Sequence, residues 1–288
     1  MIRKILPNKI FKKYFIHYVK YYIYNIKTPL MPDTMNGYVN TELDHGIATI
    51  EFYHPASNSL PAKILLNLAA AIDKAGQDER VKVIVLRSAG AGAFCAGASF
   101  DELIAISSEA EGKKFFLGFA HVINAIRKAH KFVIGRVQGK TVGGGVGLAS
   151  ACDYTIATEN ASVKLSELAV GIGPFVVGPA VERKIGTSCF SQLAMDATEW
   201  RSAEWAKKHS LYSEIYKSVE ELDDAVRHLA DKLASSNPEA MALLKKVFWK
   251  GTEHWESLLE ERAGLSGKLV LSQFTRSAIE KFKSSRKN

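Results

Sequence analysis

Short apolar runs rich in β-branched residues alternate with segments of helical spacing along most of this 288-residue chain. Residues 81–89, VKVIVLRSA, form one such run, and residues 60–75 before them repeat apolar side chains at helical spacing. The same order returns where residues 131–139, KFVIGRVQG, precede a helix-like segment at 143–151, GGGVGLASA. Strands that interleave with helices in this way predict an α/β fold.

Three other segments have patterns of their own. Residues 38–53 alternate apolar and polar side chains on both sides of Asp44-His45-Gly46, which predicts a hairpin. Residues 101–130 are helical in spacing, with a predicted break near Glu111-Gly112. From about Thr198 onward the strands nearly vanish, apart from residues 211–216, and amphipathic helices follow Ser218 and Asn237 as N-caps.

The net charge of +8 is concentrated at the start of the chain. Residues 1–32 hold seven of the 38 basic residues and no acidic one, which leaves 31 basic and 30 acidic residues elsewhere. We expect residues 1–35 to be a basic, aromatic extension that is disordered or outside the fold. Their composition would also suit an anionic membrane surface, an organellar presequence or nucleic-acid phosphates, but the nearly neutral remainder argues against nucleic-acid binding.

The three cysteines lie far apart and form no C-x-x-C pair, so the sequence predicts neither a disulfide framework nor a zinc site. A reducing, cytoplasmic location is expected.

Glycine is concentrated at one strand-to-helix junction, at positions 143, 144, 145 and 147. The spacing fits neither a phosphate-binding loop nor a G-x-G-x-x-G dinucleotide loop, and the chain has no G-x-S-x-G or H-E-x-x-H motif. A second glycine-containing turn, residues 94–103, also follows a strand and enters a helix.

These two turns could each direct a free backbone N–H at one oxygen atom, because glycine leaves the amide unobstructed and lets a bulky ligand approach. Two such donors make an oxyanion hole, in which each donor lowers a barrier by on the order of 3 kcal/mol. Alternatively, the glycines serve only close packing between strand and helix.

The chain resembles the crotonase, or enoyl-CoA hydratase/isomerase, superfamily. The resemblance runs from about Gly37 almost to the C-terminus and is carried in order by HPASNSLP, AFCAGASFDEL, VQGKTVGGGVGLASACDYTIAT, SVKLSELAVGIGP and NPEAMALLKK. It implies a spiral of ββα units with the acyl-CoA site in residues 36–197, and a helical oligomerisation region in residues 198–288. It also implies homotrimers or hexamers, acyl-CoA thioester substrates, and no metal or cofactor beyond the CoA of the substrate.

The same resemblance assigns roles to single residues. The backbone N–H groups of Ala98 and Gly144 would stabilise a thioester enolate, with Glu167 as the acid/base group. Other positions matched to the substrate site are Ala56, Asn58, Ala96, Gly97, Gly143 and Gly147. We expect the pocket wall to include residues 99–110 and 173–179.

One departure from the family pattern bears on the reaction. Hydratases of the family usually carry two glutamates, but the first of these positions is Gly147 here, and only the second, Glu167, is a glutamate. Ser166 also replaces a common proline. Addition of water is easiest with two groups, whereas one base can move a double bond, so the single glutamate favours isomerisation of an enoyl-CoA. The alternatives are a hydratase that uses Glu167 with an unidentified water-orienting group, and a non-catalytic acyl-CoA-binding protein.

Overall fold

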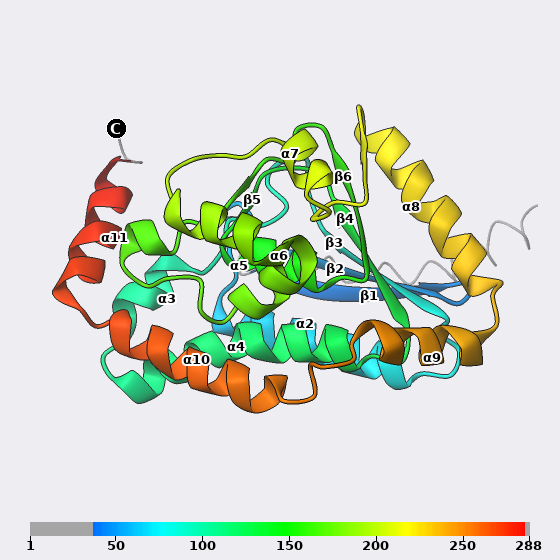
Figure 1. The fold of residues 1–288 in the computed structure, drawn as a ribbon, viewed down its shortest axis with the longest axis horizontal. Coiled ribbons are helices and arrows are strands. Elements are labelled where there is room, and N and C mark those ends of the chain that lie inside the picture. The colour runs from blue at the N-terminus through cyan, green and yellow to red at the C-terminus, as the bar shows by residue number, and fades with distance from the viewer. Residues whose placement is uncertain (1–36, 286–288) are drawn as a thin grey trace, which may run out of the picture.

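The computed structural model describes residues 37–285 and is built on one six-stranded sheet (Figure 1). The predicted extension at residues 1–35 lies outside the described residues. The strands follow the spatial order β1 (Tyr38–Asp44), β2 (Ile47–Tyr53), β3 (Val83–Ser88), β4 (Phe132–Val137), β6 (Tyr154–Thr158) and β8 (Glu214–Tyr216). Only the β1–β2 pair is antiparallel among these neighbours. Helices connect the parallel strands, so the α/β prediction is confirmed.

The hairpin predicted around residue 45 is formed by β1 and β2. Asp44 pairs with Ile47, so the turn contains only His45 and Gly46. Both turn residues have positive φ, 48° and 84°, as the twist-matched two-residue hairpin requires.

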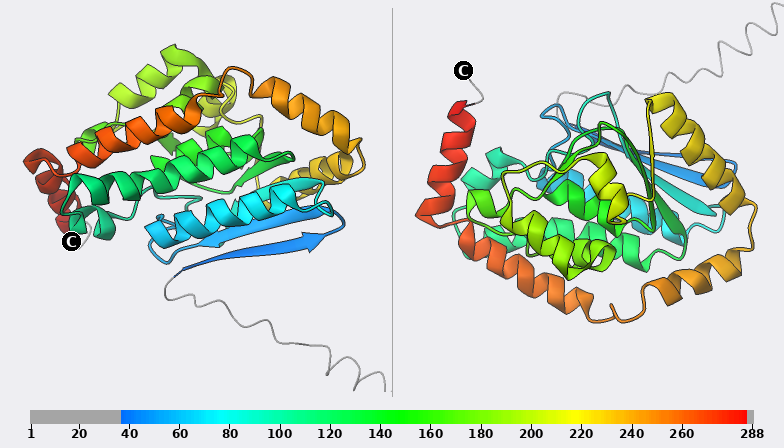
Figure 2. Two further views of the ribbon diagram at one scale, coloured as in Figure 1. Left: turned by 90° about the horizontal axis from the view of Figure 1, so that it is seen from below. Right: turned by 45° about the horizontal axis from the view of Figure 1, so that its top comes forward.

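The sheet is buried on both faces by different helices (Figures 1 and 2). Ile84 and Leu86 of β3 join the larger core beneath α2 (Ala62–Gln77) and α4 (Glu109–Lys128). Val83 and Val85 point the other way, into a smaller core shared with α8 (Val219–Ala234). Because successive side chains of a strand alternate between faces, burial on both faces explains the uninterrupted apolar run of β3.

The predicted helix break near Glu111-Gly112 is wrong. The chain instead leaves the helical conformation between α3 (Phe100–Ala105) and α4, where the Ser108 hydroxyl accepts a hydrogen bond from the Glu111 N–H and caps α4. Gly112 lies inside α4, and glycine is needed at this position because another helix packs directly on it. A Cβ there would lie 2.7 Å from the Cα of Gly267.

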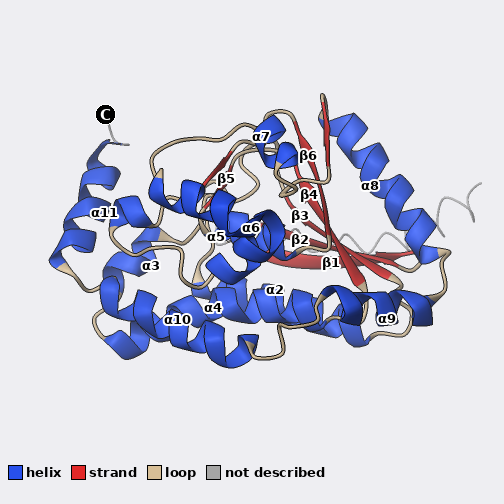
Figure 3. Cartoon of the chain, viewed as in Figure 1, coloured by secondary structure: helices blue, strands red, loops and turns tan. Residues whose placement is uncertain are grey.

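That neighbour is α10 (Trp255–Leu269), which runs along α4 between α9 (Pro238–Phe248) and α11 (Gln273–Ser285) (Figure 2). Residues 198–285 are mostly helical, as predicted (Figure 3), and Ser218 and Asn237 do cap α8 and α9. This part is nevertheless continuous with the core, since β8 pairs with β6 and α8 covers the sheet.

A smaller two-stranded sheet carries the glycine-rich junction. It pairs β5 (Thr141–Val142) with β7 (Val163–Lys164), and α5 (Gly144–Ala151) begins directly after β5. Three further helical elements follow β7 in the chain: η1 (Leu168–Val170), α6 (Gly178–Met195) and α7 (Ala203–Lys208). The sequence patterns did not predict α6, in which Gly186 has a non-helical φ of 76°.

Two further observations concern location and metal binding. Between residues 37 and 285, every helix is too short or too polar to cross a membrane. The same residues contain no cluster of three or more histidine, cysteine or acidic side chains arranged to hold a metal ion. The cytoplasmic location and the absence of a cofactor stay predictions.

Candidate active site

The glycines at the start of α5 are explained first by close packing within the protein. A Cβ on Gly144 would lie 2.1 Å from Cε1 of Phe119, and one on Gly145 would lie 2.6 Å from Cβ of Cys95. At Gly147 the nearest atom, 2.4 Å away, is Cγ1 of Val177. Close packing of protein atoms therefore accounts for glycine at these three positions, and it leaves open whether a backbone N–H there also serves a ligand.

Gly143 is different, because it faces a carboxylate. Its φ of 53° lies in the left-handed region that favours glycine, and a Cβ there would lie 3.0 Å from Oε1 of Glu167. The Gly143 N–H donates to the Lys164 carbonyl of β7, only three residues before Glu167. The junction and the glutamate are thus held together by the small sheet.

The second turn lies directly against this junction. The backbones of Cys95 and Thr141 form an isolated parallel β-bridge, and the Gly97 carbonyl accepts a hydrogen bond from the Leu60 N–H. Gly97, with φ of 87°, packs so tightly that a Cβ would lie 3.2 Å from the Val142 carbonyl oxygen and 3.8 Å from the Gly144 nitrogen. The two glycine turns, distant in sequence, therefore meet.

Two backbone donors are left over at this meeting point. Within residues 37–285, the N–H groups of Ala98 and Gly144 make no hydrogen bond, and both residues line one pocket. The Gly144 N–H is also at the N-terminus of α5, where N–H groups have no partner within the helix. This arrangement is suited to binding an oxygen that carries negative charge.

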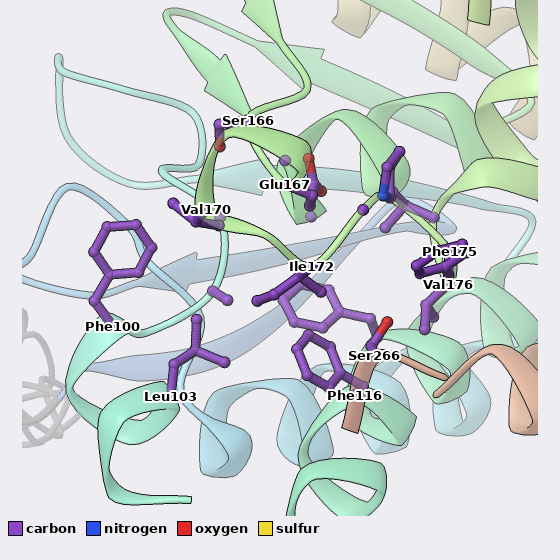
Figure 4. Close-up of a pocket in the computed structure, with 18 of the residues that line it drawn as sticks. Phe100, Leu103, Phe116, Ser166, Glu167, Val170, Ile172, Phe175, Val176 and Ser266 are labelled. Carbon is purple, nitrogen blue, oxygen red and sulfur yellow. The ribbon is translucent and has the colours of Figure 1, made fainter. Parts of the chain in front are cut away.

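Glu167 lies in the same pocket, just before η1 (Figure 4). Its Oε2 atom is shielded from solvent and, among the described residues, has no hydrogen-bond partner. Burial raises the pKa of this carboxyl from an ordinary value of 4.5 to about 7. A carboxylate with this pKa exists in both protonation states near neutral pH, as a group that takes up and returns protons must.

The rest of this inner pocket is largely apolar, with a cavity volume of about 50 Å³. That is several times the ~10–15 Å³ that one water molecule needs. Of the residues described by the structure, Glu167 is the only ionisable one that lines it. The principal apolar wall residues are Phe100, Leu103, Phe116, Phe119, Val170, Ile172, Phe175, Val176 and Val177.

A larger groove opens from the inner pocket toward the surface. The two share Ala96, Ala98, Phe100, Ser166 and Val170. Its outer part includes basic and aromatic side chains from β7, the loop before α7, and α11: Lys164, Trp200, Phe274 and Lys281.

Two positively charged side chains lie over the ring of Trp200, which lines the groove. The ammonium nitrogen of Lys164 lies 4.5 Å from the centroid of the Trp200 ring, and that of Lys140 lies 5.1 Å from it. Desolvation by burial lowers the pKa of Lys164.

Comparison with known proteins identifies the family. A family model described as enoyl-CoA hydratase/isomerase matches residues 42–287. The chain belongs to the enoyl-CoA hydratase/isomerase family. The resemblance to the crotonase superfamily is thereby confirmed, as is the expectation that the chain is an enzyme of this family.

This chain is similar to relatives that are named for different reactions. It is 27% identical over 251 residues to a probable enoyl-CoA hydratase of Bacillus subtilis, covering 86% of this chain and 96% of the relative. It is 28% identical over 211 residues to the peroxisomal Delta(3,5)-Delta(2,4)-dienoyl-CoA isomerase of Arabidopsis thaliana, covering 68% of this chain and 74% of that one.

The fold is shared with a solved member of the family. The crystal structure of an enoyl-CoA hydratase from Bacillus halodurans aligns with a TM-score of 0.78, covering 85% of this chain and 99% of that one at 23% identity. The predicted crotonase-like architecture is confirmed by this agreement.

Most of the predicted site residues of this family member converge. The inner pocket is lined by Ala96, Gly97, Ala98, Gly143, Gly144 and Glu167, and Ala56 lines the outer groove. The predicted wall segments also contribute, through Phe100 and Leu103 from one and residues 173–177 from the other. The roles assigned to these residues stay predictions.

Two predicted substrate-binding residues lie elsewhere. The Asn58 side chain donates to the carbonyls of Ala89 and Ala93 and accepts from the His54 N–H, so it holds the loop together and lines neither cavity. Gly147 is separated from the pocket by Val177, which itself lines the wall. The part predicted for both residues in substrate binding stays a prediction.

The contributions of α4 and α10 to the pocket were not predicted from the sequence. Phe116 and Phe119 follow the helical spacing of α4 and were indistinguishable from core residues. Ser266 also lines the pocket, from a helix about 100 residues beyond Glu167. Only the packing of α10 on α4 brings it there, and no local sequence pattern indicates that contact.

Proposed function

We propose that this protein isomerises an enoyl-CoA by moving its carbon–carbon double bond, with Glu167 as the acid/base group. The observation that carries the proposal is the pairing of a single ionisable side chain with two unused backbone donors in one apolar pocket. One base is sufficient for this reaction, whereas addition of water requires a water molecule to be held and activated.

The proposed reaction begins with the thioester carbonyl oxygen at the N–H groups of Ala98 and Gly144. The Glu167 carboxylate removes a proton from C2 of a 3-enoyl-CoA, breaking the C–H bond, and the electron pair moves into an enolate whose oxygen the two N–H groups stabilise. The carboxylic acid then returns the proton to C4 as the enolate collapses. The double bond has moved from C3–C4 to C2–C3, and no atom is gained or lost.

The outer groove supports the assignment of a CoA thioester. CoA carries phosphate groups and an adenine, and this groove presents Lys164, Lys281 and the Trp200 ring. Because the groove and the inner pocket share residues, a thioester with its CoA in the groove could extend its acyl chain past Ala98 toward Glu167.

Hydration is the second candidate, favoured by the high coverage of the chain by a relative named as a probable hydratase. It would require a second group to orient water. Position 147 does not supply one, because it is a glycine and Val177 fills the space where a side chain would lie. Non-catalytic binding of acyl-CoA is a third alternative. The raised pKa of Glu167, whose Oε2 atom is buried and has no hydrogen-bond partner among the described residues, argues against it.

A substrate panel tests the proposal. Wild-type protein is expected to convert 3-enoyl-CoA to 2-enoyl-CoA rapidly and to hydrate 2-enoyl-CoA slowly, as measured by thioester absorbance. Glu167→Gln, which keeps the shape and removes the base, should lower isomerisation by roughly 10²-fold or more. Glu42→Gln, at an exposed glutamate on β1, is the matched control and should leave it unchanged. Fast hydration with little isomerisation would show that the second candidate is correct.

A further inference from the structure

Ser266 of α10 is fully buried and lines the inner pocket, yet within the described residues its hydroxyl has no hydrogen-bond partner. A serine inside a helix commonly bonds the carbonyl four residues earlier, which is Arg262 here. That bond is absent too, among residues 37–285. Figure 4 shows Glu167 and Ser266 on opposite sides of the pocket with Ile172 between them.

The position of this hydroxyl is fixed by its helix. Its neighbour Gly267 packs against α4 so closely that a Cβ would lie 2.4 Å from the Lys113 nitrogen. α10 therefore cannot rotate to carry Ser266 away from the pocket without losing this contact. A buried hydroxyl left without a partner costs about 1–3 kcal/mol, and an alanine would fill the same position without that cost.

The location of Ser266 indicates which part of a substrate it meets. Ala98 lines both the outer groove and the inner pocket, whereas Ser266 lines the inner pocket alone, on the side opposite Glu167 (Figure 4). If the thioester carbonyl lies at Ala98 and Gly144 with its CoA in the groove, the acyl chain extends into the inner pocket and its far end can meet Ser266. This step rests on the function proposed above.

The charge of the pocket restricts the chemistry of that far end. No lysine, arginine or histidine is found among the described residues that line the inner pocket. A carboxylate or phosphate on the acyl chain would be buried there without a counter-ion, at a large cost. A hydroxyl or a ketone would need only one hydrogen bond, which the Ser266 hydroxyl can donate or accept.

We propose that Ser266 is a specificity-determining residue whose hydroxyl binds a neutral oxygen group, a hydroxyl or a ketone, at the far end of the acyl chain. The protein then discriminates against chains that end in a methyl group, because such a chain leaves the serine hydroxyl unpaired in the complex.

Ser266→Ala is the test variant, and Ser150→Ala is its matched control. The Ser150 hydroxyl is likewise buried and unpartnered within the described residues, but it lies in α5 and lines neither cavity. Since each substitution removes a hydroxyl that no group of the protein bonds, we expect both variants to melt at or slightly above the wild-type temperature without ligand.

The readout is selectivity between short acyl-CoA thioesters that differ only in ending with a methyl, hydroxyl, ketone or carboxylate group. Dissociation constants of saturated thioesters are measured by calorimetry, and kcat/KM of the corresponding enoyl thioesters by absorbance. Wild type and Ser150→Ala should prefer the hydroxyl or ketone over the methyl end by about 10- to 100-fold. Ser266→Ala should lose most of this preference, and carboxylate ends should bind no better than methyl ends.

The outcomes separate this inference from the proposed function. An equal preference in wild type and Ser266→Ala, or a wild-type preference for methyl or carboxylate ends, overturns the assignment of Ser266. If the saturated thioesters bind with the expected preference but no enoyl-CoA is turned over, the reaction is wrong and the binding assignment holds. If no thioester binds, both are wrong.

Discussion

At the scale of single residues, the site depends on a carboxylate kept in an unfavourable environment. Glu167 has a buried oxygen without a partner among the described residues, and its pKa is raised to about 7 by burial. Such a group destabilises the fold when it is ionised, and its presence in a pocket beside two unused N–H donors favours a role in chemistry over a structural one.

The pH dependence of isomerisation should report this pKa. Glu167 must be ionised to remove a proton, so kcat/KM should rise with pH and reach half its plateau near pH 7, well above the 4.5 of an ordinary glutamate. The measurement is kcat/KM for a 3-enoyl-CoA between pH 5 and pH 9, with buffers of constant ionic strength. A kcat/KM that is already at its plateau at pH 5.5 would contradict burial as the controlling influence.

The stability of the protein should depend on the same carboxyl. Because its folded-state pKa lies above its unfolded-state pKa, the native state binds the extra proton between about 4.5 and 7, and that stabilising contribution is lost as pH rises through 7. Glu167→Gln should therefore melt several degrees above wild type at pH 8, with a smaller difference at pH 4.5. The effect is on the order of 3 kcal/mol at most. Equal melting temperatures at pH 8 would indicate that the ionised carboxylate is solvated.

The missing second glutamate can be tested together with the residue that fills its space. Gly147→Glu alone should be destabilising and should not restore hydration, because a Cβ would lie 2.4 Å from Val177 Cγ1 and 2.6 Å from its Cβ. Gly147→Glu with Val177→Gly removes both contacts and opens a path into the pocket. The double variant should hydrate 2-enoyl-CoA faster than Val177→Gly alone, measured by loss of enoyl thioester absorbance. No gain over that control would show that the new carboxylate does not reach the substrate.

At the scale of elements, the fold was largely predictable because most strands and helices carry their own local pattern. The hairpin turn at His45-Gly46 and the caps at Ser218 and Asn237 depend on neighbouring residues alone. The convergence of residues 94–103 with the start of α5 was predictable only through the family resemblance. The entry of Ser266 into the pocket depends on long-range packing, which no local pattern encodes.

The contact between α4 and α10 offers a test with a control on the same helix. Gly267→Ala should lower the melting temperature and weaken binding of acyl-CoA, because its Cβ would collide with the backbone of Gly112 and Lys113. Gly264→Ala, one turn earlier, meets nothing within 4 Å and should raise stability by about 0.5–1 kcal/mol through helix propensity. Thermal melts and calorimetry of both variants measure the difference. Equal effects would mean that α10 adjusts freely on α4.

At the scale of the whole molecule, α9 presents an apolar face that the described chain does not cover. Its inner side buries Met241 and Lys245, whereas Leu243, Leu244 and Val247 are 55%, 47% and 66% exposed. Contiguous exposed apolar side chains of this kind mark association surfaces. They support the prediction that residues 198–288 pack against neighbouring copies in a trimer or hexamer.

Charge on this face should separate the copies. Leu244→Glu with Val247→Glu is expected to shift the mass measured by light scattering from an assembly toward the 31.7 kDa chain, while Lys246→Glu on the same helix should leave it unchanged. A wild-type protein that is already monomeric at micromolar concentration would refute the prediction of assembly.

The two donors that we propose for the oxyanion, at Ala98 and Gly144, are main-chain N–H groups, and this has a consequence for how the protein can diversify. A side-chain substitution does not delete a backbone N–H unless it introduces proline, so mutation rarely removes these donors directly. The surrounding wall residues, by contrast, face the pocket through their side chains. Substitutions there can change the shape of the pocket without removing either backbone donor. A population of variants selected on new thioesters should therefore accumulate changes at positions such as Phe175 and Ser266 while the two turns remain unaltered. The type of reaction and the choice of substrate are thereby determined by different positions of the same chain.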